Sequence, residues 1–157
     1  MKRLQVLKIT KKVEYALIAL KHMSVKDGQT LTSARELCEA YSMPFDTMAK
    51  VLQAMNQAGW LTSLKGIKGG YTLSSDLSQI SFMQLTRAIE GQEAANVCMG
   101  NKGMCELHGT CNIVTPVTQL HKHVTSFLEN LNIDQLLTSG PTLPLPAWQY
   151  EGKTDGI

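Results

Sequence analysis

The apolar residues in the first third of the chain have the spacing of short amphipathic helices. Apolar side chains recur every three or four positions between residues 11 and 23, which predicts a helix that ends near Asp27-Gly28. A second helix is predicted from the capping hydroxyl of Thr32 or Ser33 to about Tyr41, and with Ser33 as the cap, Glu36 would complete a capping box. The positions expected to face inward are Ala34, Leu37, Cys38 and Tyr41.

A third helix is predicted to begin at Pro44, because Ser42-Met43-Pro44 interrupts the pattern and proline fits a first helical turn. It should run to about Ala58, and its expected inward residues are Met48, Val51, Leu52 and Met55. Two short helices joined by a tight turn are typical of a helix-turn-helix, whose second helix enters the major groove of DNA. A helical hairpin that only builds a core would show the same pattern.

A strand, a glycine-rich turn and a second strand follow these helices in the sequence pattern. Residues 60–64 and 71–73 are the predicted strands, and the turn is Lys65-Gly66-Ile67-Lys68-Gly69-Gly70. The predicted hairpin therefore carries two lysines at its tip. Three helices followed by a basic hairpin are typical of a winged helix, in which the lysines and exposed amides of the wing meet phosphates beside the groove.

Two further helices are predicted in the second half of the chain. Residues 81–90 give a short helix with Phe82, Leu85, Ala88 and Ile89 inward. A longer helix opens at Pro116, and its apolar residues are spaced by three, four, three and four positions: Val117, Leu120, Val124, Phe127 and Leu131. This heptad seam favours helix pairing. A helix packed on its own domain would look similar, but a symmetric DNA reader needs a dimer, so we prefer pairing between two chains.

These elements predict a mainly α protein with a small β-wing. A winged helix-turn-helix DNA-binding domain is expected over residues 1–80, and a cysteine-containing loop with a long dimerisation helix over residues 81–137. Residues 138–157 contain three prolines and few apolar periodicities, and are expected to form an extended or disordered tail. Basic residues interrupt every apolar run in the first ten positions, so we expect no secretory or membrane-spanning segment and a cytoplasmic location.

The charged residues are unevenly divided along the chain. Residues 1–72 carry eleven Lys or Arg and five Asp or Glu, whereas residues 73–157 carry four and eight, so by subtraction the first part is about +6 and the second about −4. The first part is therefore suited to an anionic partner, and double-stranded DNA is the obvious candidate. The sequence contains no G-x-x-x-x-G-K phosphate-binding motif and no readable catalytic triad, so we do not expect an enzyme.

Three of the four cysteines, Cys98, Cys105 and Cys111, lie in one short glycine-containing loop. Thiolates are soft ligands suited to iron–sulfur clusters, zinc or copper(I), and glycines let the backbone approach a common centre. In a reducing compartment, clustered cysteines are more often ligands or redox sensors than disulfides. Three thiolates leave one coordination position to fill, and His108, inside the loop, can bind iron or zinc through a ring nitrogen.

Five features of the sequence occur together and in a characteristic order. They are Tyr15-Ala16-Leu17, M-A-K-V-L-Q-A-M-N-Q-A-G-W-L-T-S from Met48 to Ser63, K-G-I-K-G-G-Y-T-L from Lys65 to Leu73, Ala88-Ile89-Glu90-Gly91 and the three clustered cysteines. In these features the chain resembles the Rrf-two type winged-helix regulators, the family of the iron–sulfur regulators IscR and NsrR, over about residues 6–137. The resemblance implies a homodimeric repressor of transcription that binds an operator in DNA. It also implies one [2Fe-2S] or [4Fe-4S] cluster per subunit, whose state alters operator affinity.

The same resemblance implies which residue supplies the fourth ligand. Some members have a histidine three residues after the last cysteine, but Val114 occupies that position here. In others an acid in the first helix of the partner subunit is the ligand, and Glu14 occupies the matching place. We therefore prefer Glu14 to His108, although its ordinary explanation would be a surface ion pair with a neighbouring lysine. Six residues separate Cys98 from Cys105 where five are common in the family, so the cluster type stays open.

The candidate DNA contacts come from three segments. They are Pro44, Phe45, Asp46, Thr47 and Lys50 in the groove, Lys65 and Lys68 on phosphates, and Lys11 or Lys12 near the backbone. The expected signal is nitric oxide, redox state or cellular iron–sulfur status. One alternative is a winged-helix regulator with a structural zinc or no metal. An iron–sulfur electron-transfer protein is a weaker alternative, because it has no evident need for a helix-turn-helix and a basic wing.

Overall fold

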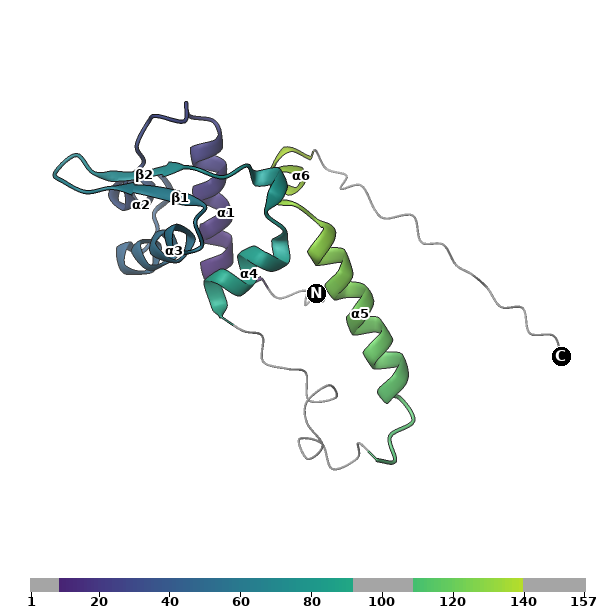
Figure 1. Cartoon of the computed structure of the whole chain (residues 1–157). Helices are drawn as coiled ribbons and strands as arrows, with labels where there is room; N and C mark the ends of the chain where they lie inside the picture. Colours follow the sequence, from purple (N-terminus) through teal and green to yellow (C-terminus); the bar gives the residue numbers. More distant parts are fainter. Residues whose placement is uncertain (1–8, 92–108, 140–157) are drawn as a thin grey trace, which may run out of the picture.

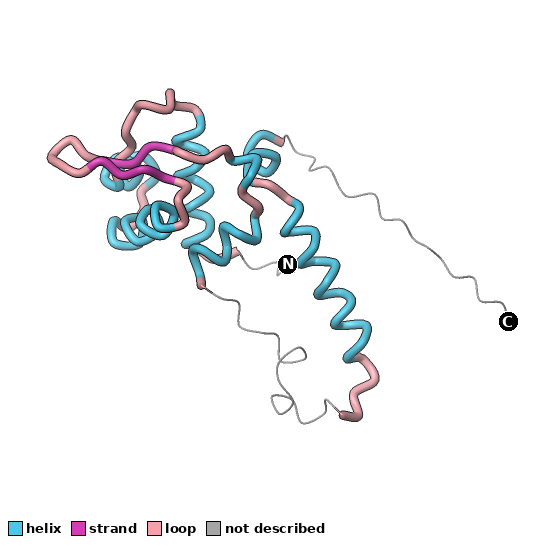
Figure 2. Tube along the Cα trace, viewed as in Figure 1, coloured by secondary structure: helices cyan, strands magenta, loops and turns pink. Residues whose placement is uncertain are grey.

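The computed structural model describes residues 9–91 and 109–139, which are mainly helical with one small sheet (Figure 1). Figure 2 shows the two strands as a hairpin beside the first three helices. The elements in chain order are α1 (Lys11–Ser24), α2 (Ala34–Tyr41), α3 (Phe45–Gln57), β1 (Leu61–Leu64), β2 (Gly70–Leu73), η1 (Leu77–Gln79), α4 (Phe82–Glu90), α5 (Val114–Asn130) and α6 (Ile133–Thr138). The mainly helical fold with a small wing, as predicted from the sequence, is confirmed.

One hydrophobic core joins the first three helices and α4. Helix α3 buries the four residues that its spacing placed inward, Met48, Val51, Leu52 and Met55. Helix α1 packs against α3 and α4, and α2 packs against α3. Each fully buried side chain of this size stabilises the fold by about 1.5–3 kcal/mol relative to exposure. The core therefore fixes which face of α3 is left for other contacts.

Helix α2 begins where the sequence indicated, but its polar residues make different contacts from those predicted. Ser33 is the N-cap, and its Oγ accepts a hydrogen bond from the backbone N–H of Glu36 at 3.1 Å. The Glu36 carboxylate instead bonds His22 and Lys26, so the predicted capping box is only half formed. The prediction that Tyr41 faces inward is wrong: Tyr41 is 45% exposed, and its hydroxyl bonds His22 at the surface instead of entering the core. Cys38 is half-buried, and desolvation raises the pKa of its thiol.

The wing is an antiparallel hairpin attached to the segment that precedes α2. Strands β1 and β2 pair from Leu61 opposite Leu73 to Leu64 opposite Gly70. Two backbone hydrogen bonds join Thr32 and Tyr71, with N–H to carbonyl oxygen distances of 2.8 and 2.9 Å. A Cβ on Gly70 would lie 2.9 Å from the carbonyl oxygen of Thr32, so this close approach requires glycine. The hairpin was predicted, but its attachment to Thr32 was not.

Helix α5 extends away from the winged helix-turn-helix portion (Figure 1). It begins at Val114, two residues before the predicted start at Pro116. Two backbone hydrogen bonds of 2.8 Å join the chain after α5 to the start of α4: the Phe82 N–H donates to the carbonyl oxygen of Leu131, just after α5, and the Ile133 N–H donates to the carbonyl oxygen of Ile80, just before α4. The short helix α6, which the sequence did not predict, follows and buries Ile133. Within the described ranges, no helix has the length and apolar character needed to cross a membrane.

Candidate nucleic-acid interface and metal-ligating residues

Helix α3 presents a polar face opposite its buried face. Pro44 is the N-cap with extended backbone (φ −65°, ψ 127°), so it lies just before the helix and not in its first turn. Phe45 is 55% exposed, Asp46 and Lys50 are exposed, and Thr47 is half-buried. The five residues predicted to enter a DNA groove are therefore brought together at the start of α3, with Pro44 just before the helix and the other four on its first turns. Because the opposite face of α3 is packed in the core, these side chains remain accessible to a partner.

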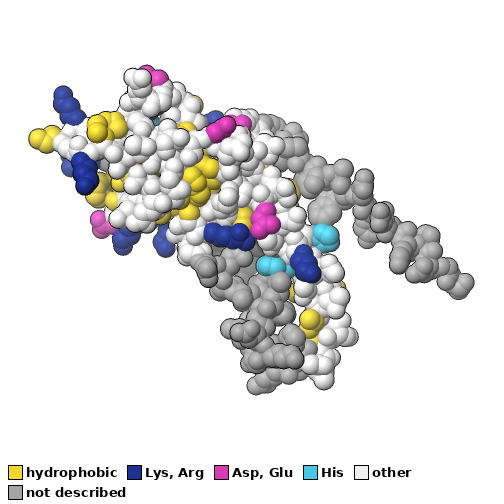
Figure 3. Space-filling view, viewed as in Figure 1, with side chains coloured by type: hydrophobic (Ala, Val, Ile, Leu, Met, Phe, Trp, Pro, Cys, Tyr) yellow, Lys and Arg dark blue, Asp and Glu magenta, His cyan; other side chains and the backbone are white. Residues whose placement is uncertain are grey.

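The tip of the wing carries the two predicted lysines. Lys65 and Lys68 are both exposed, and they flank Ile67, whose exposed fraction is 108%. Gly66 has a φ of 126°, a backbone conformation that favours glycine, so the turn depends on this residue. Figure 3 shows Lys and Arg side chains gathered at the wing and along the edge below α3. The wing thus adds positive charge beside the accessible face of α3.

The two lysines at the start of α1 have acidic partners within the chain. Lys11 Nζ lies 2.6 Å from Glu14 Oε2, and this hydrogen bond, followed by the charge of Glu14, raises the pKa of Lys11. Lys12 Nζ lies 3.6 Å from a carboxylate oxygen of Glu90, the last residue of α4. The Thr10 hydroxyl, which caps α1, also donates to Glu90. The first turn of α1 is therefore tied to the end of α4.

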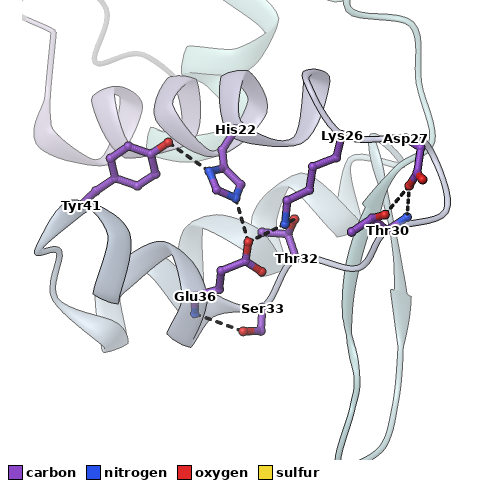
Figure 4. Close-up of polar contacts among 8 residues, drawn as sticks. All are labelled: His22, Lys26, Asp27, Thr30, Thr32, Ser33, Glu36 and Tyr41. Carbon is purple, nitrogen blue, oxygen red and sulfur yellow. Dashed lines mark hydrogen bonds and ion pairs between the residues drawn. The ribbon is translucent and has the colours of Figure 1, made fainter.

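A polar network joins α1 and the residues just after it to α2 (Figure 4). His22 bonds the Tyr41 hydroxyl through Nδ1 at 3.0 Å and the Glu36 carboxylate through Nε2 at 2.8 Å. Lys26 bonds the same carboxylate and donates to Thr32 Oγ1 at 2.9 Å. Burial raises the pKa of the Glu36 carboxyl, but hydrogen bonds and charges from Lys26 and His22 outweigh it and hold the pKa below its ordinary value. The network fixes α2 and the base of the wing against α1.

The candidate metal ligands are divided between described and undescribed residues. Cys98, Cys105 and His108 lie outside the described residues. Cys111 is a half-buried free thiol shortly before α5, and Glu14 lies on α1. Figure 1 shows the N-terminal end of α5 well away from α1, so one chain does not bring this pair together. Among the described residues, no group of three or more His, Cys, Asp or Glu side chains could hold a metal ion.

Comparison with known proteins shows which family the chain belongs to. A sequence model of Rrf2, described as an iron-dependent transcriptional regulator, matches residues 9–139. The chain belongs to the Rrf2 family. It is 24% identical over 139 residues to the transcriptional regulator IscR of Vibrio parahaemolyticus, covering 88% of this chain and 82% of that protein. It is 26% identical over 140 residues to the transcriptional repressor NsrR of Streptomyces coelicolor, covering 88% and 93%.

A solved structure shows the same fold at low sequence identity. The oxidized form of Staphylococcus aureus CymR superposes with a TM-score of 0.65 and 21% identity, covering 87% of this chain and 100% of that one. The Rrf2-family relatives found by sequence are regulators of transcription and not enzymes, as the sequence indicated. The chain is thus an Rrf2-family transcription regulator with a winged-helix fold.

Ile67 and Glu90 were not predicted from the sequence as candidate functional residues, although Ile67 lies at the tip of the wing and Glu90 contacts the first turn of α1. Ile67 could have been noticed, because a large aliphatic residue is unusual in a glycine-rich turn between two lysines. Glu90 gave no such signal, since its partners Thr10 and Lys12 lie about eighty positions away in the chain. Long-range contacts of this kind depend on how α1 and α4 pack.

Proposed function

We propose that this Rrf2-family protein is a homodimeric repressor that binds operator DNA through α3 and the wing, with an affinity set by an iron–sulfur cluster. The observation that carries the DNA-binding part is the accessible face of α3 beside a basic wing. Phe45 and Lys50 are exposed on α3, and Lys68 is exposed on the wing. Side chains of α3 would read base edges, while the lysines would contact phosphates and fix the register of the protein on the duplex.

The dimer is supported by the apolar side of α5. Ile113 just before the helix is 55% exposed, Leu120 is 64% exposed and Val124 is 43% exposed. These positions follow the heptad spacing that favours pairing of two helices. Two paired α5 helices would carry two wings and two recognition helices. A symmetric reader of this kind needs half-sites about 34 Å apart, one turn of the duplex.

The ligands proposed for the cluster are Cys98, Cys105, Cys111 and Glu14 of the partner subunit. Three thiolates and one carboxylate are a donor set compatible with a [2Fe-2S] or [4Fe-4S] cluster, and the described members fit this role, since Cys111 is a free thiol. Glu14 is 41% exposed and pairs with Lys11, which is 77% exposed; such surface ion pairs are weak, so the carboxylate can change partner. When bound, the cluster would supply a centre sensitive to nitric oxide or redox state.

The position of Glu14 suggests how ligation would affect DNA binding. Glu14 shares the first turns of α1 with Lys11 and Lys12, the lysines proposed to lie near the DNA backbone. Releasing Glu14 from Lys11 would free that ammonium group, and Glu90 holds the same turn from the end of α4. A change at Glu14 would therefore act on the charge and placement of this basic turn.

Anaerobic purification followed by DNA selection tests the proposal. The protein should be coloured and contain iron and sulfide, with absorbance and Mössbauer spectra that identify the cluster. Wild-type protein, with and without its cluster, is then offered fragments of genomic DNA, and the affinity for the selected duplex should differ between the two forms. Colourless protein with stoichiometric zinc would support a structural zinc instead. Equal affinities of the two forms for the selected duplex would show that the cluster does not regulate DNA binding.

A matched pair of variants tests the fourth ligand. Glu14→Ala should change the absorbance spectrum or speed the decay of the cluster in air, because an oxygen ligand is lost. Glu39→Ala removes an exposed acid on α2 and should leave both unchanged. His108→Ala tests the competing ligand in the same way. If Glu14→Ala leaves the spectrum and decay unaltered while His108→Ala changes them, His108 takes the place of Glu14.

A further inference from the structure

The wing ends in a fully exposed aliphatic side chain. Ile67 has an exposed fraction of 108%, higher than Val25 at 74% or Leu64 at 60%. It lies in the turn between the strands, at the end of the hairpin farthest from the core (Figure 1). A large aliphatic group in water gains free energy on burial, so this side chain is suited to a contact outside the chain.

The wing holds Ile67 in a defined position. The turn is closed by a hydrogen bond of 2.9 Å from the Gly69 N–H to the Gly66 carbonyl oxygen. Four residue pairs join β1 to β2, and the bridge between Thr32 and Tyr71 attaches the base of the hairpin to the segment before α2. Thr32 itself is completely buried. Ile67 is therefore presented on an anchored hairpin beside α3.

The shape and charge of the tip favour one partner. Two of the five residues between the strands are glycine, so Ile67 and the two lysines supply all of the side chains of the turn. A single aliphatic side chain is narrower than the minor groove of DNA, which is roughly 6 Å wide, so the Ile67 side chain can enter the groove. Lys65 and Lys68 flank Ile67 and would face the phosphates on either side. This charge pattern favours DNA over an apolar protein surface.

We propose that Ile67 is an apolar wedge that enters the minor groove beside the α3 site and partly unstacks a base step there. The proposal rests on the proposed DNA-binding function and adds a way of reading sequence to it. Apolar side chains inserted between base steps kink the duplex, and flexible steps such as TA and CA are the least costly to deform. Ile67 would thus make the protein prefer easily deformed base steps at the position that the wing contacts, without hydrogen bonds to the bases.

The test uses full-length protein and the duplex that the wild type selects from genomic fragments. Hydroxyl-radical footprinting locates the wing, and 2-aminopurine is placed at the steps beneath it, where unstacking raises its fluorescence. We expect wild type and Ile67→Leu to raise the fluorescence. Ile67→Ala should abolish the rise and bind about tenfold more weakly, because a large aliphatic contact is lost. Its salt dependence should match that of the wild type, because no charge is removed.

Two control variants separate the wedge from other effects. Lys68→Ala should reduce the salt slope by about one and keep the fluorescence signal. Val25 is another exposed aliphatic residue, and Val25→Ala should change neither the salt slope of binding nor the 2-aminopurine fluorescence. The wedge is overturned, and the proposed function kept, if Ile67→Ala binds within twofold of the wild type with the same fluorescence. If the wild type selects no duplex, the DNA-binding function falls and the wedge falls with it.

Discussion

The winged helix-turn-helix portion and α5 differ in how completely a single chain buries their apolar residues. In α3 the four inward residues have exposed fractions of 2% or less. In α5, which is longer, Leu128 is the one buried residue, and both Leu120 and Val124 remain exposed. The recognition helix of the first portion therefore buries its apolar face within a single chain. The apolar side of α5 has the exposure expected of a helix that pairs with a second chain.

The largest expected effect comes from cutting into the core. Leu52→Ala should lower the free energy of unfolding by about 2–5 kcal/mol, because a fully buried side chain is replaced by a cavity. Urea denaturation followed by circular dichroism measures this change. Leu64→Ala, on the exposed side of the wing, is the matched control and should stay within about 0.5 kcal/mol of the wild type. Equal losses for both variants would contradict the assignment of the core.

A charge on the apolar side of α5 should affect association more than folding. Leu120→Asp should weaken self-association by about tenfold or more, because a carboxylate would be buried where an aliphatic group was. Gln119→Asp adds the same charge at an exposed neighbouring position and should have little effect. Sedimentation velocity over a concentration series measures both. Unchanged association of Leu120→Asp would contradict the proposed pairing of two α5 helices.

A smaller effect, confined to the winged portion, is expected from Glu36 on acidification. The folded-state pKa of its carboxyl lies below the ordinary value of 4.5, so its stabilisation is fully present above that value and is lost as the pH falls through the folded-state pKa. Glu36→Gln should therefore lose less stability than the wild type between about pH 7 and about pH 3. Denaturation midpoints across this range measure it, with Glu39→Gln as the control. Parallel pH profiles for wild type and Glu36→Gln would show that the contacts of Glu36 with Lys26 and His22 do not contribute to the pH dependence of stability.

The smallest effect is expected where the two portions meet. Arg87 Nη2 on α4 lies 3.3 Å from Glu129 Oε1 on α5, and both side chains are about half exposed. Glu129→Ala should change the free energy of unfolding by at most about 1 kcal/mol, because exposed ion pairs are weak and screened. Thermal unfolding at low and high salt measures it, and the difference from the wild type should shrink as salt rises. A larger loss that is independent of salt would indicate packing instead of charge.

Local patterns in the sequence were enough to predict α1, α2, α3 and the wing. The inward residues of α3, a hydroxyl cap at Thr32 or Ser33, and the two strands with their glycine-rich turn all depend on spacings of a few residues. The pairing of Lys11 with Glu14, three positions apart, was available in the same way. The clustering of Cys98, Cys105 and Cys111 is also local, although Cys98 and Cys105 lie outside the described residues.

Only the tertiary structure decided which groups meet across long separations. It placed Glu36 against Lys26 and His22 instead of in a capping box, joined Thr32 to Tyr71, and tied Glu90 to the start of α1. It also left Ile67 as the exposed tip of an anchored hairpin. Helix periods and caps are set by neighbours in sequence, so the chain determines them by itself. Polar partners and exposed faces depend on how whole elements pack, and packing brings together residues that no local spacing relates.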